Sequence, residues 1–318
     1  IGFCLVGSEM CIRDRGNLVK VADGFHFLEG PRWHENKLWF SDMHGYKVHN
    51  LDAAGNLSTL AEIPEQPSGL GWLPDGSLII VSMLDRKLMK LKDGKLSVHA
   101  DMSHLTPYQC NDMVISKNGT AYVGNFGSDN VESKIHKTCL ISVTHEGEAK
   151  ICVDGLLFPN GTVISPDGKE LVVGETFGGN LTSFQISESG ELSNRAIWAR
   201  VMPLHFKIIT SIIRFLNIPL KESNSTPFPV PDGICLDSDN GIWVASPTTA
   251  EVIRFKKGGK ITDRIATPQP AYACMLGGKD EKELFILTAE SSNPQFCKKN
   301  KTGEIYKVSV DYERAGEP

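Results

Sequence analysis

Short apolar runs recur along the whole chain and are separated by clusters of turn residues. Leu78–Val81, Leu171–Val173 and Ile242–Val244 are typical of these runs. Runs of this length that are rich in Val, Ile, Leu and aromatic residues predict β-strands rather than helices. Helical periodicity is confined to one segment of the chain. The pattern therefore predicts an all-β protein whose strands are joined by short turns.

One sequence motif occurs six times along the chain. Each copy contains a lead residue, an apolar strand, a turn rich in Gly, Asp or Asn, and a second apolar strand. The interval between lead residues is 39 to 49 residues, except for one interval of 72 residues. A repeat of this period is typical of a propeller, with one four-stranded blade for each copy. We therefore predict one six-bladed β-propeller domain over residues 16–318. The lead residues are Glu29, Ser68, Asn111, Asn160, Asp232 and Ala273.

The long interval holds an insertion of about 30 residues, at about 199–229. Within it, residues 206–218 place apolar side chains on one face and polar ones on the other, between Pro203 and Pro219. This spacing predicts an amphipathic helix. Three roles stay open for the helix: packing on the propeller rim, a lid over the pocket mouth, or a homodimer contact. Docking on a membrane surface is less favoured, because only Lys207 and Arg214 supply positive charge.

The N-terminal region divides into two parts. Residues 1–15 lack the basic start and the cleavage site of a signal peptide, and we interpret them as a non-native segment and leave them out of the fold prediction. Asn17 to Phe27 predicts one strand without a hairpin partner. In a propeller such a strand can pair with the last blade and close the ring, which removes an exposed edge. We predict that role for it.

The composition and charge of the chain limit which kinds of molecule it is expected to bind. The net charge is −5 with scattered Lys and Arg, which argues against a nucleic-acid partner. No apolar run approaches the ~20 residues of a membrane span. Outside residues 1–15 the cysteines are dispersed, without close metal-type spacing, and predict free thiols. Free thiols without a signal peptide indicate the cytoplasm, and the periplasm is the alternative if the true N-terminus is missing.

The lead residues predict a metal site. The innermost strand of each propeller blade runs beside the central channel, so equivalent positions form a ring around one axis. Two carboxylates, Glu29 and Asp232, would meet two carboxamides, Asn111 and Asn160. Hard oxygen donors of this kind suit Ca²⁺, or Mg²⁺ and Mn²⁺ with additional waters. Asn-Gly and Asp-Gly are also common turn dipeptides, and any single one is more simply explained as a turn. Agreement in register among four positions favours the metal site.

Four segments carry a family resemblance. LEGPRW, CNDMVISKNGTAYVGNFG, FPNGTVISPDGKELVVGETF and PDGICLDSDNGIWVA resemble the gluconolactonase and senescence-marker-protein (regucalcin-like) family of six-bladed propellers. The resemblance implies a divalent cation bound by Glu29, Asn160 and Asp232, with Asn111 as a fourth ligand or a substrate contact. Ca²⁺ is the favoured ion, and Mg²⁺, Mn²⁺ or Zn²⁺ are the alternatives. Gln109 stands where sugar lactonases of this family have Arg, so sugar specificity is in doubt.

The predicted function is metal-dependent hydrolysis of a lactone, either a sugar lactone or a related cyclic ester. Asp232 would act as general base on a metal-activated water, and Asn111 would orient the ring ester. Gln109 and Asn125 are the expected substrate contacts, and His44 or Glu175 are weaker candidates for the pocket lining. The alternatives are a metal-dependent phosphotriesterase or arylesterase, and a non-catalytic ligand-binding propeller.

Overall fold

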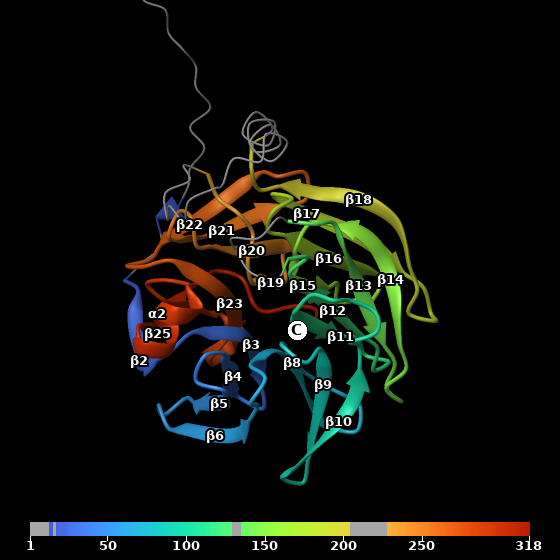
Figure 1. Cartoon of the computed structure of the whole chain (residues 1–318). Coiled ribbons are helices and arrows are strands. Elements are labelled where there is room, and N and C mark those ends of the chain that lie inside the picture. Colours follow the sequence, from blue (N-terminus) through green and yellow to red (C-terminus); the bar gives the residue numbers. More distant parts are fainter. Residues whose placement is uncertain (1–12, 15–16, 129–134, 204–227) are drawn as a thin grey trace, which may run out of the picture.

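The computed structural model describes residues 13–14, 17–128, 135–203 and 228–318. In these ranges six β-sheets are arranged around a central axis (Figure 1). This confirms the predicted six-bladed β-propeller. Blade 1 contains β3 (Leu28–His34), β4 (Lys37–Asp42), β5 (Lys47–Asp52) and β6 (Leu57–Glu62). Blade 2 contains β7 (Pro67–Trp72), β8 (Leu78–Ser82), β9 (Lys87–Lys92) and β10 (Lys95–Asp101). Blade 3 contains β11 (Cys110–Ile115), β12 (Ala121–Asn125), β13 (Thr138–Val143) and β14 (Ala149–Leu156).

The other three blades follow the same antiparallel order, with the innermost strand first. Blade 4 contains β15 (Pro159–Ile164), β16 (Glu170–Glu175), β17 (Asn180–Ile186) and β18 (Leu192–Arg200). Blade 5 contains β19 (Ile234–Leu236), β20 (Gly241–Ser246), β21 (Glu251–Lys256) and β22 (Ile261–Ala266), and β1 (Arg13–Asp14) pairs parallel with β22. Blade 6 contains β23 (Ala271–Gly277), β24 (Glu283–Thr288), β25 (Gly303–Ser309) and β2 (Val19–Phe25), with the 3₁₀ turn η1 (Lys279–Glu281) between β23 and β24.

The hydrophobic pattern reflects how deep each strand lies in its blade. The second strands are packed on both faces, and all five residues of β8 are buried. The outer strand β10 of the same blade is mostly exposed. Apolar clusters fill the spaces between neighbouring blades, as between Leu70 and Ile80 of blade 2 and Val48 of blade 1. Burial on both faces explains why the second strands form continuous apolar runs in the sequence.

The N-terminal strand closes the ring as predicted. β2 is the outermost strand of blade 6 and pairs antiparallel with β25, with Val19 opposite Lys307. Blade 6 is therefore built from both ends of the described chain (Figure 1). The pairing covers the free edge of β25 and joins the first blade to the last.

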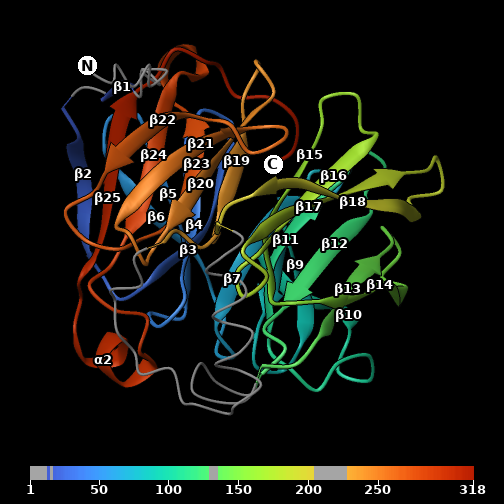
Figure 2. The same ribbon diagram turned by 90° about the horizontal axis from the view of Figure 1, so that it is seen from above.

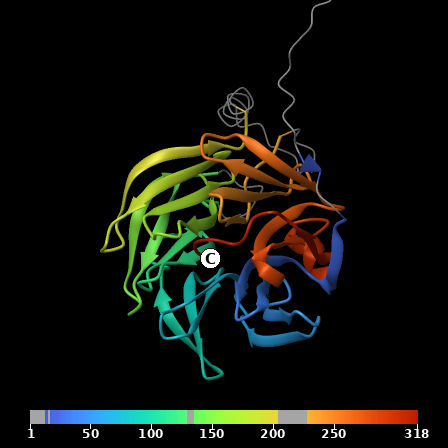
Figure 3. The ribbon, with the colours of Figure 1, turned by 180° about the vertical axis from the view of Figure 1, so that it is seen from behind.

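The two ends of the central channel differ. The inner strands start on the face that carries α2 (Pro294–Lys299), and Figure 2 shows the C-terminal segment on the opposite face. There the backbone of Glu317 pairs with that of Ile164 at the end of β15, and the Ala315 N–H donates to the Leu236 carbonyl. Figure 3 shows this segment running to the centre of the ring. Residues 311–318 thus cover the far end of the inner strands.

The helical content differs from the prediction. The predicted helix at 206–218 lies outside the described residues, and β18 continues to Arg200, slightly beyond the expected start of the insertion. The α-helix in the described chain is α2, which the sequence analysis missed. Asn293 caps it by accepting hydrogen bonds from two backbone N–H groups, and Pro294 occupies its first turn. A helix of 6 residues is too short to produce a detectable helical period.

Five of the six lead residues lie inside an inner strand rather than before it. Asn160 belongs to β15, for example, and only Asp232 precedes its strand, β19. In blades 2, 3 and 4 the pairing register shifts at the lead residue and the residue after it, as between Pro159 and Thr162. A bulge of this kind turns a side chain away from its usual alternation. The repeated bulge directs the lead side chains toward the axis.

A glycine follows the lead residue in four of the six blades, and it allows neighbouring inner strands to approach closely. A Cβ on Gly161 would lie 2.5 Å from the Ile234 nitrogen and 2.6 Å from the Asp232 carbonyl oxygen. A Cβ on Gly30 would lie 2.5 Å from the Ser68 carbonyl oxygen. Because the obstructing atoms are backbone, they cannot move aside without displacing a strand. The close approach of the inner strands therefore depends on these glycines.

We predict that Gly161→Ala destabilises the fold by about 3 kcal/mol, because the added methyl group has no space between β15 and β19. Gly168→Ala is the matched control. Gly168 lies in the turn of the same blade with nothing near its Cβ position, so its cost of about 1–2 kcal/mol comes from its positive φ alone. Urea unfolding of both variants measures the difference. A Gly161→Ala protein as stable as the Gly168→Ala protein would contradict the close-packing account.

Candidate metal centre

The structure brings three of the four predicted ligands into one hydrogen-bonded chain. The Asn111 Nδ2 donates to the Asn160 Oδ1 at 2.9 Å, and the Asn160 Nδ2 donates to the Asp232 Oδ1 at 2.5 Å. Ser68, the lead residue of blade 2, extends the chain by donating from its Oγ to the Asn111 Oδ1 at 3.3 Å. The chain crosses four consecutive blades, so the equivalent positions do converge on the axis.

Glu29 completes the set from blade 1. It is 5% exposed, and Asn111, Asn160 and Asp232 are 2%, 2% and 7% exposed. One Glu29 carboxylate oxygen accepts the N–H of Gly30 at 3.3 Å. The negative charge of Asp232 acts on the Glu29 carboxylate strongly enough to raise its pKa. The two buried carboxylates therefore share one electrostatic environment.

Burial and neighbouring negative charges set the protonation of the two carboxylates. Loss of solvation raises the pKa of Glu29 well above its usual value, and the charges of Asp232 and Asp112 raise it further. Loss of solvation also raises the pKa of Asp232 to about 8, although the hydrogen bond from Asn160 opposes the shift. Without a cation, protons therefore stay on these groups near neutral pH. A divalent cation would replace those protons and supply the missing positive charge.

The donor set fits a hard divalent cation. The four predicted ligands are two buried carboxylates and two buried carboxamides, with no thiol or imidazole among them, and hydrogen bonds join three of the four. In the described part of the chain, no cluster of three or more His, Cys, Asp or Glu side chains forms a metal site of the usual type. Half of the predicted donors are Asn residues, so this finding leaves the predicted set unaffected. Carboxylate and carbonyl oxygens are the ligands that Ca²⁺ prefers.

A buried ion pair beside the ring was missed by the sequence analysis. The Arg32 NH2 donates to the Asp112 Oδ1 at 2.6 Å, and the Arg32 Nε donates to the Leu70 carbonyl at 2.8 Å. Both charged side chains are almost fully buried. Arg32 thereby ties the inner strands of blades 1, 2 and 3 together and lowers the pKa of Glu29 by its charge. The signal that could have revealed this ion pair is the position of Arg32 within an otherwise buried inner strand.

The predicted substrate contacts lie on the same side of the ring as Asn111. Gln109 is half-buried two residues before Asn111, and its backbone carbonyl accepts the Phe126 N–H at 3.0 Å. Asn125 is fully buried, donates to the Cys139 carbonyl at 2.8 Å and accepts a hydrogen bond from Thr138. These bonds lie within blade 3. The hydrogen bonds of Asn125 do not reach the ligand ring, and its role as a substrate contact stays a prediction.

The two weaker candidates have different surroundings. The Glu175 carboxylate accepts hydrogen bonds from the Leu157 N–H and Thr182 hydroxyl and pairs with Arg195, all within blade 4. His44 lies in the turn after β4, and its Nδ1 is 3.0 Å from the Gln66 Nε2. Burial lowers the pKa of His44 to about 4, so its ring is neutral at pH 7. Glu175 therefore supports the blade, and His44 offers a neutral ring near the start of the inner strands.

Comparison with known proteins now gives the family. The sequence model of the SMP-30/Gluconolactonase/LRE-like region matches residues 27–290, and the chain belongs to this family. It is 24% identical over 266 residues to the pentonolactonase of Haloferax volcanii, covering 82% of this chain and 81% of that one. The family match identifies the class of protein to which this propeller belongs.

Solved structures share the fold at low identity. The calcium-binding protein regucalcin from Agrobacterium tumefaciens aligns with a TM-score of 0.72 at 16% identity, covering 96% of this chain and 98% of that one. A gluconolactonase from Xanthomonas campestris aligns with a TM-score of 0.68 at 20% identity, covering 92% and 89%. At these identities the likeness establishes the fold alone.

The structure also bears on the predictions about membrane spans and cysteines. None of the helices in the described part of the chain is long and apolar enough to span a membrane. The cysteines of the described residues are free thiols, as predicted, at positions 110, 139, 152, 235, 274 and 297. The cytoplasmic location stays a prediction.

We predict that Ca²⁺ stabilises the protein more at pH 8 than at pH 5.5. Because the Asp232 pKa is raised from 3.8 to about 8, the metal-free protein holds a proton that the unfolded chain releases, and its stability falls as pH rises through this window. Bound Ca²⁺ removes that loss, since it requires the ionised carboxylates. At a Ca²⁺ concentration of about 100 times Kd, stabilisation of ~2.7 kcal/mol corresponds to roughly 5 °C at pH 8.

Thermal unfolding with Ca²⁺ and with EDTA at the two pH values measures this effect. Asp232→Asn is the control, because it retains an oxygen that can accept from Asn160 but has no proton to exchange. Its Ca²⁺-induced shift should be smaller and less dependent on pH than that of the wild-type protein, because only Glu29 still exchanges a proton. Equal shifts for the wild-type protein at both pH values would show that these carboxylates do not bind the ion.

Proposed function

We propose that this protein is a metal-dependent hydrolase that opens a lactone or a related cyclic ester. The observation that carries the proposal is the buried chain from Ser68 through Asn111 and Asn160 to Asp232, together with the buried Glu29 carboxylate, whose pKa burial and the charge of Asp232 raise. A purely structural ring would not need two buried carboxylates, of which one raises the pKa of the other by its charge. Membership of the SMP-30/Gluconolactonase/LRE-like family and the pentonolactonase relative support lactone hydrolysis as the general reaction.

Glu29, Asn160 and Asp232 would hold the cation, with Asn111 as a fourth ligand or a substrate contact. Ca²⁺ is favoured by the all-oxygen donor set, and the related propeller from Agrobacterium tumefaciens is described as calcium-binding. Mg²⁺, Mn²⁺ and Zn²⁺ are the alternatives. Such an ion supplies a Lewis acid for the ester carbonyl and lowers the pKa of a nearby water.

The residues of the chain then have distinct roles. The Asp232 Oδ1 is held by Asn160, so the second carboxylate oxygen is available to accept the proton of the attacking water. The water oxygen would bond to the carbonyl carbon, the ring C–O bond would break, and the ring oxygen would take up the proton that Asp232 had accepted from the water, to give the hydroxy acid. General-base assistance of this kind contributes ~10²- to 10⁴-fold to the rate. The Asn111 amide would orient the ester.

The substrate is a small molecule, because the candidate donors are buried at the start of the inner strands rather than displayed on the outer blade edges. Residues 311–318 cover the opposite end of the inner strands. Substrate would therefore approach from the face that carries α2 (Figure 2). This face is where the turns after each second strand lie, and these turns border the ring.

We predict that Asp232→Asn lowers lactone turnover by at least ~10²-fold, since the amide cannot accept the proton. Asp167→Asn, in the exposed turn of blade 4, is the matched control and should keep wild-type turnover. Initial rates with Ca²⁺ and with EDTA over lactones, paraoxon and p-nitrophenyl esters give the measurement. Wild-type turnover by Asp232→Asn would exclude Asp232 as the base, and wild-type activity unaffected by EDTA would exclude the metal.

A further inference from the structure

A second ring of residues lies two positions before each lead residue, where the chain enters the inner strand. It contains four apolar residues and two glutamines and has no charged side chain. Its members are Phe27, Gln66, Gln109, Phe158, Val230 and Ala271. Each of these residues precedes the lead residue of its inner strand, toward the face from which substrate would approach, and four of the six are buried.

In several blades the first residue of the turn after the second strand lies beside the second-ring residue of that blade. In blades 1 to 4 the second-ring carbonyl accepts the backbone N–H of the first turn residue, at 2.8 to 3.1 Å. The donors are Met43, Met83, Phe126 and Thr176. The repeated hydrogen bond places the two series next to each other in each blade. Three of these four turn residues are apolar, and none is charged.

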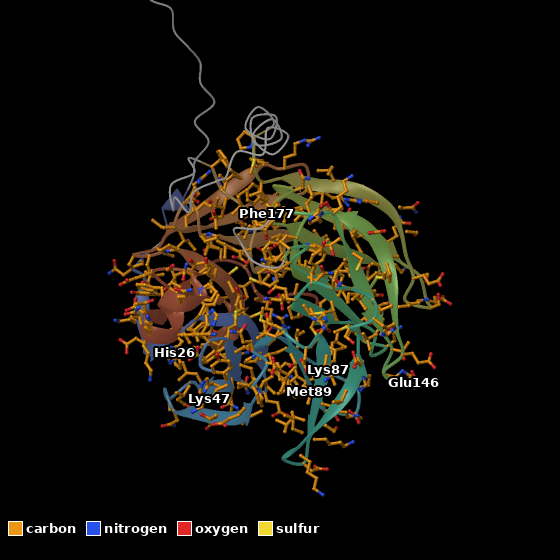
Figure 4. The ribbon with its side chains drawn as sticks, in the orientation of Figure 1. His26, Lys47, Lys87, Met89, Glu146 and Phe177 are labelled. Carbon is orange, nitrogen blue, oxygen red and sulfur yellow. The ribbon has the colours of Figure 1, made fainter. Side chains whose placement is uncertain are left out.

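Phe126 and Phe158, one from each series, form an aromatic cluster with Phe177 at blades 3 and 4. The rings of Phe126 and Phe158 are stacked with centroids 4.4 Å apart, and the rings of Phe158 and Phe177 are 5.2 Å apart. Phe126 and Phe177 keep part of their surface exposed. Figure 4 labels Phe177 in the turn between β16 and β17, in the view onto the α2 face.

This cluster is directly connected to the ligand ring. The Asn160 Nδ2 donates to the Thr176 Oγ1 at 3.2 Å, and the Thr176 N–H donates to the Phe158 carbonyl at 3.1 Å. Phe158 has a φ of 56°, a conformation that a bulky side chain rarely adopts. Such strain persists where the surroundings hold it, and it concentrates at functional sites. The strained backbone orients the Phe158 ring toward Phe126 and Phe177.

We propose that the substrate carries an apolar group that packs on Phe126, Phe158 and Phe177 while its ester reaches the ligand ring. This proposal rests on the proposed function. The substrate class is a neutral lactone or ester with an alkyl or aryl substituent. A polyhydroxylated sugar lactone is a poor fit, because its hydroxyl groups would lose hydrogen bonds to water against an aromatic surface that offers few in return. The second ring contains no charged side chain that could bind an anionic substrate.

The test compares kcat/KM for three lactones with Ca²⁺ present: γ-nonalactone, unsubstituted γ-butyrolactone and glucono-δ-lactone. We expect γ-nonalactone to exceed each of the others by at least about tenfold, as a well-filled apolar pocket provides. Phe126→Ala and Phe177→Ala should each lower the ratio of γ-nonalactone to γ-butyrolactone by about tenfold. Trp39→Ala, which removes a half-buried aromatic side chain from β4, is the control and should leave the ratio unchanged.

A binding measurement separates this inference from the proposed function. Calorimetry with the non-hydrolysable lactam analogue of γ-nonalactone should show binding to the wild-type protein that Phe126→Ala weakens. If no ester or lactone is hydrolysed but the lactam binds in this way, the hydrolase proposal fails and the apolar site stands. If glucono-δ-lactone is the best substrate, or the two Phe variants keep the wild-type ratio and lactam affinity, the apolar site is wrong.

Discussion

The close approach of neighbouring inner strands around the axis is the constraint on which the rest of the structure depends. Gly161 lies against the backbone of Asp232 and Ile234, and Gly30 lies against that of Ser68. Bulges at the same positions direct the lead side chains inward. Without this approach, residues separated by 49 to 72 positions in the chain could not form the hydrogen bonds that join Asn111, Asn160 and Asp232.

The same approach creates an electrostatic cost that only a cation offsets fully. Glu29 and Asp232 are both buried, and the pKa of each is raised by lost solvation. Arg32 compensates one neighbouring carboxylate, that of Asp112, in a direct ion pair. Glu29 and Asp232 hold protons near neutral pH instead, and one divalent cation would replace the protons of these two carboxyl groups. Packing and charge therefore support the same assignment of the ring.

Much of the fold could be predicted from the sequence because its unit is local and repeated. A phrase that occurs six times indicates six blades, and an unpaired first strand indicates how the ring closes. Register also placed Asn111, Asn160 and Asp232 together, since equivalent positions in a propeller converge. Features that depend on contacts between distant segments could not be found in this way. Arg32 and Asp112 are 80 residues apart, and their pairing requires the folded ring.

Local signals were also ambiguous where turns and strands use the same residues. Asn160-Gly161 looks like a turn dipeptide, yet it lies in a bulge inside β15, because glycine serves both structures. Asn125 was expected to contact the substrate, but its carboxamide bonds within its own blade. The short helix α2 has no period to detect. In each of these cases tertiary packing decides between structures that the local sequence permits equally.

The most direct test of the central claim is to locate the ion. Crystals grown with Mn²⁺, which can be identified by its anomalous scattering, would show whether an ion lies on the axis. The account predicts one strong peak within coordination distance of oxygen atoms of Glu29, Asn160 and Asp232. An axis without a peak in crystals whose ring is intact, or a peak coordinated only by other residues, would contradict it.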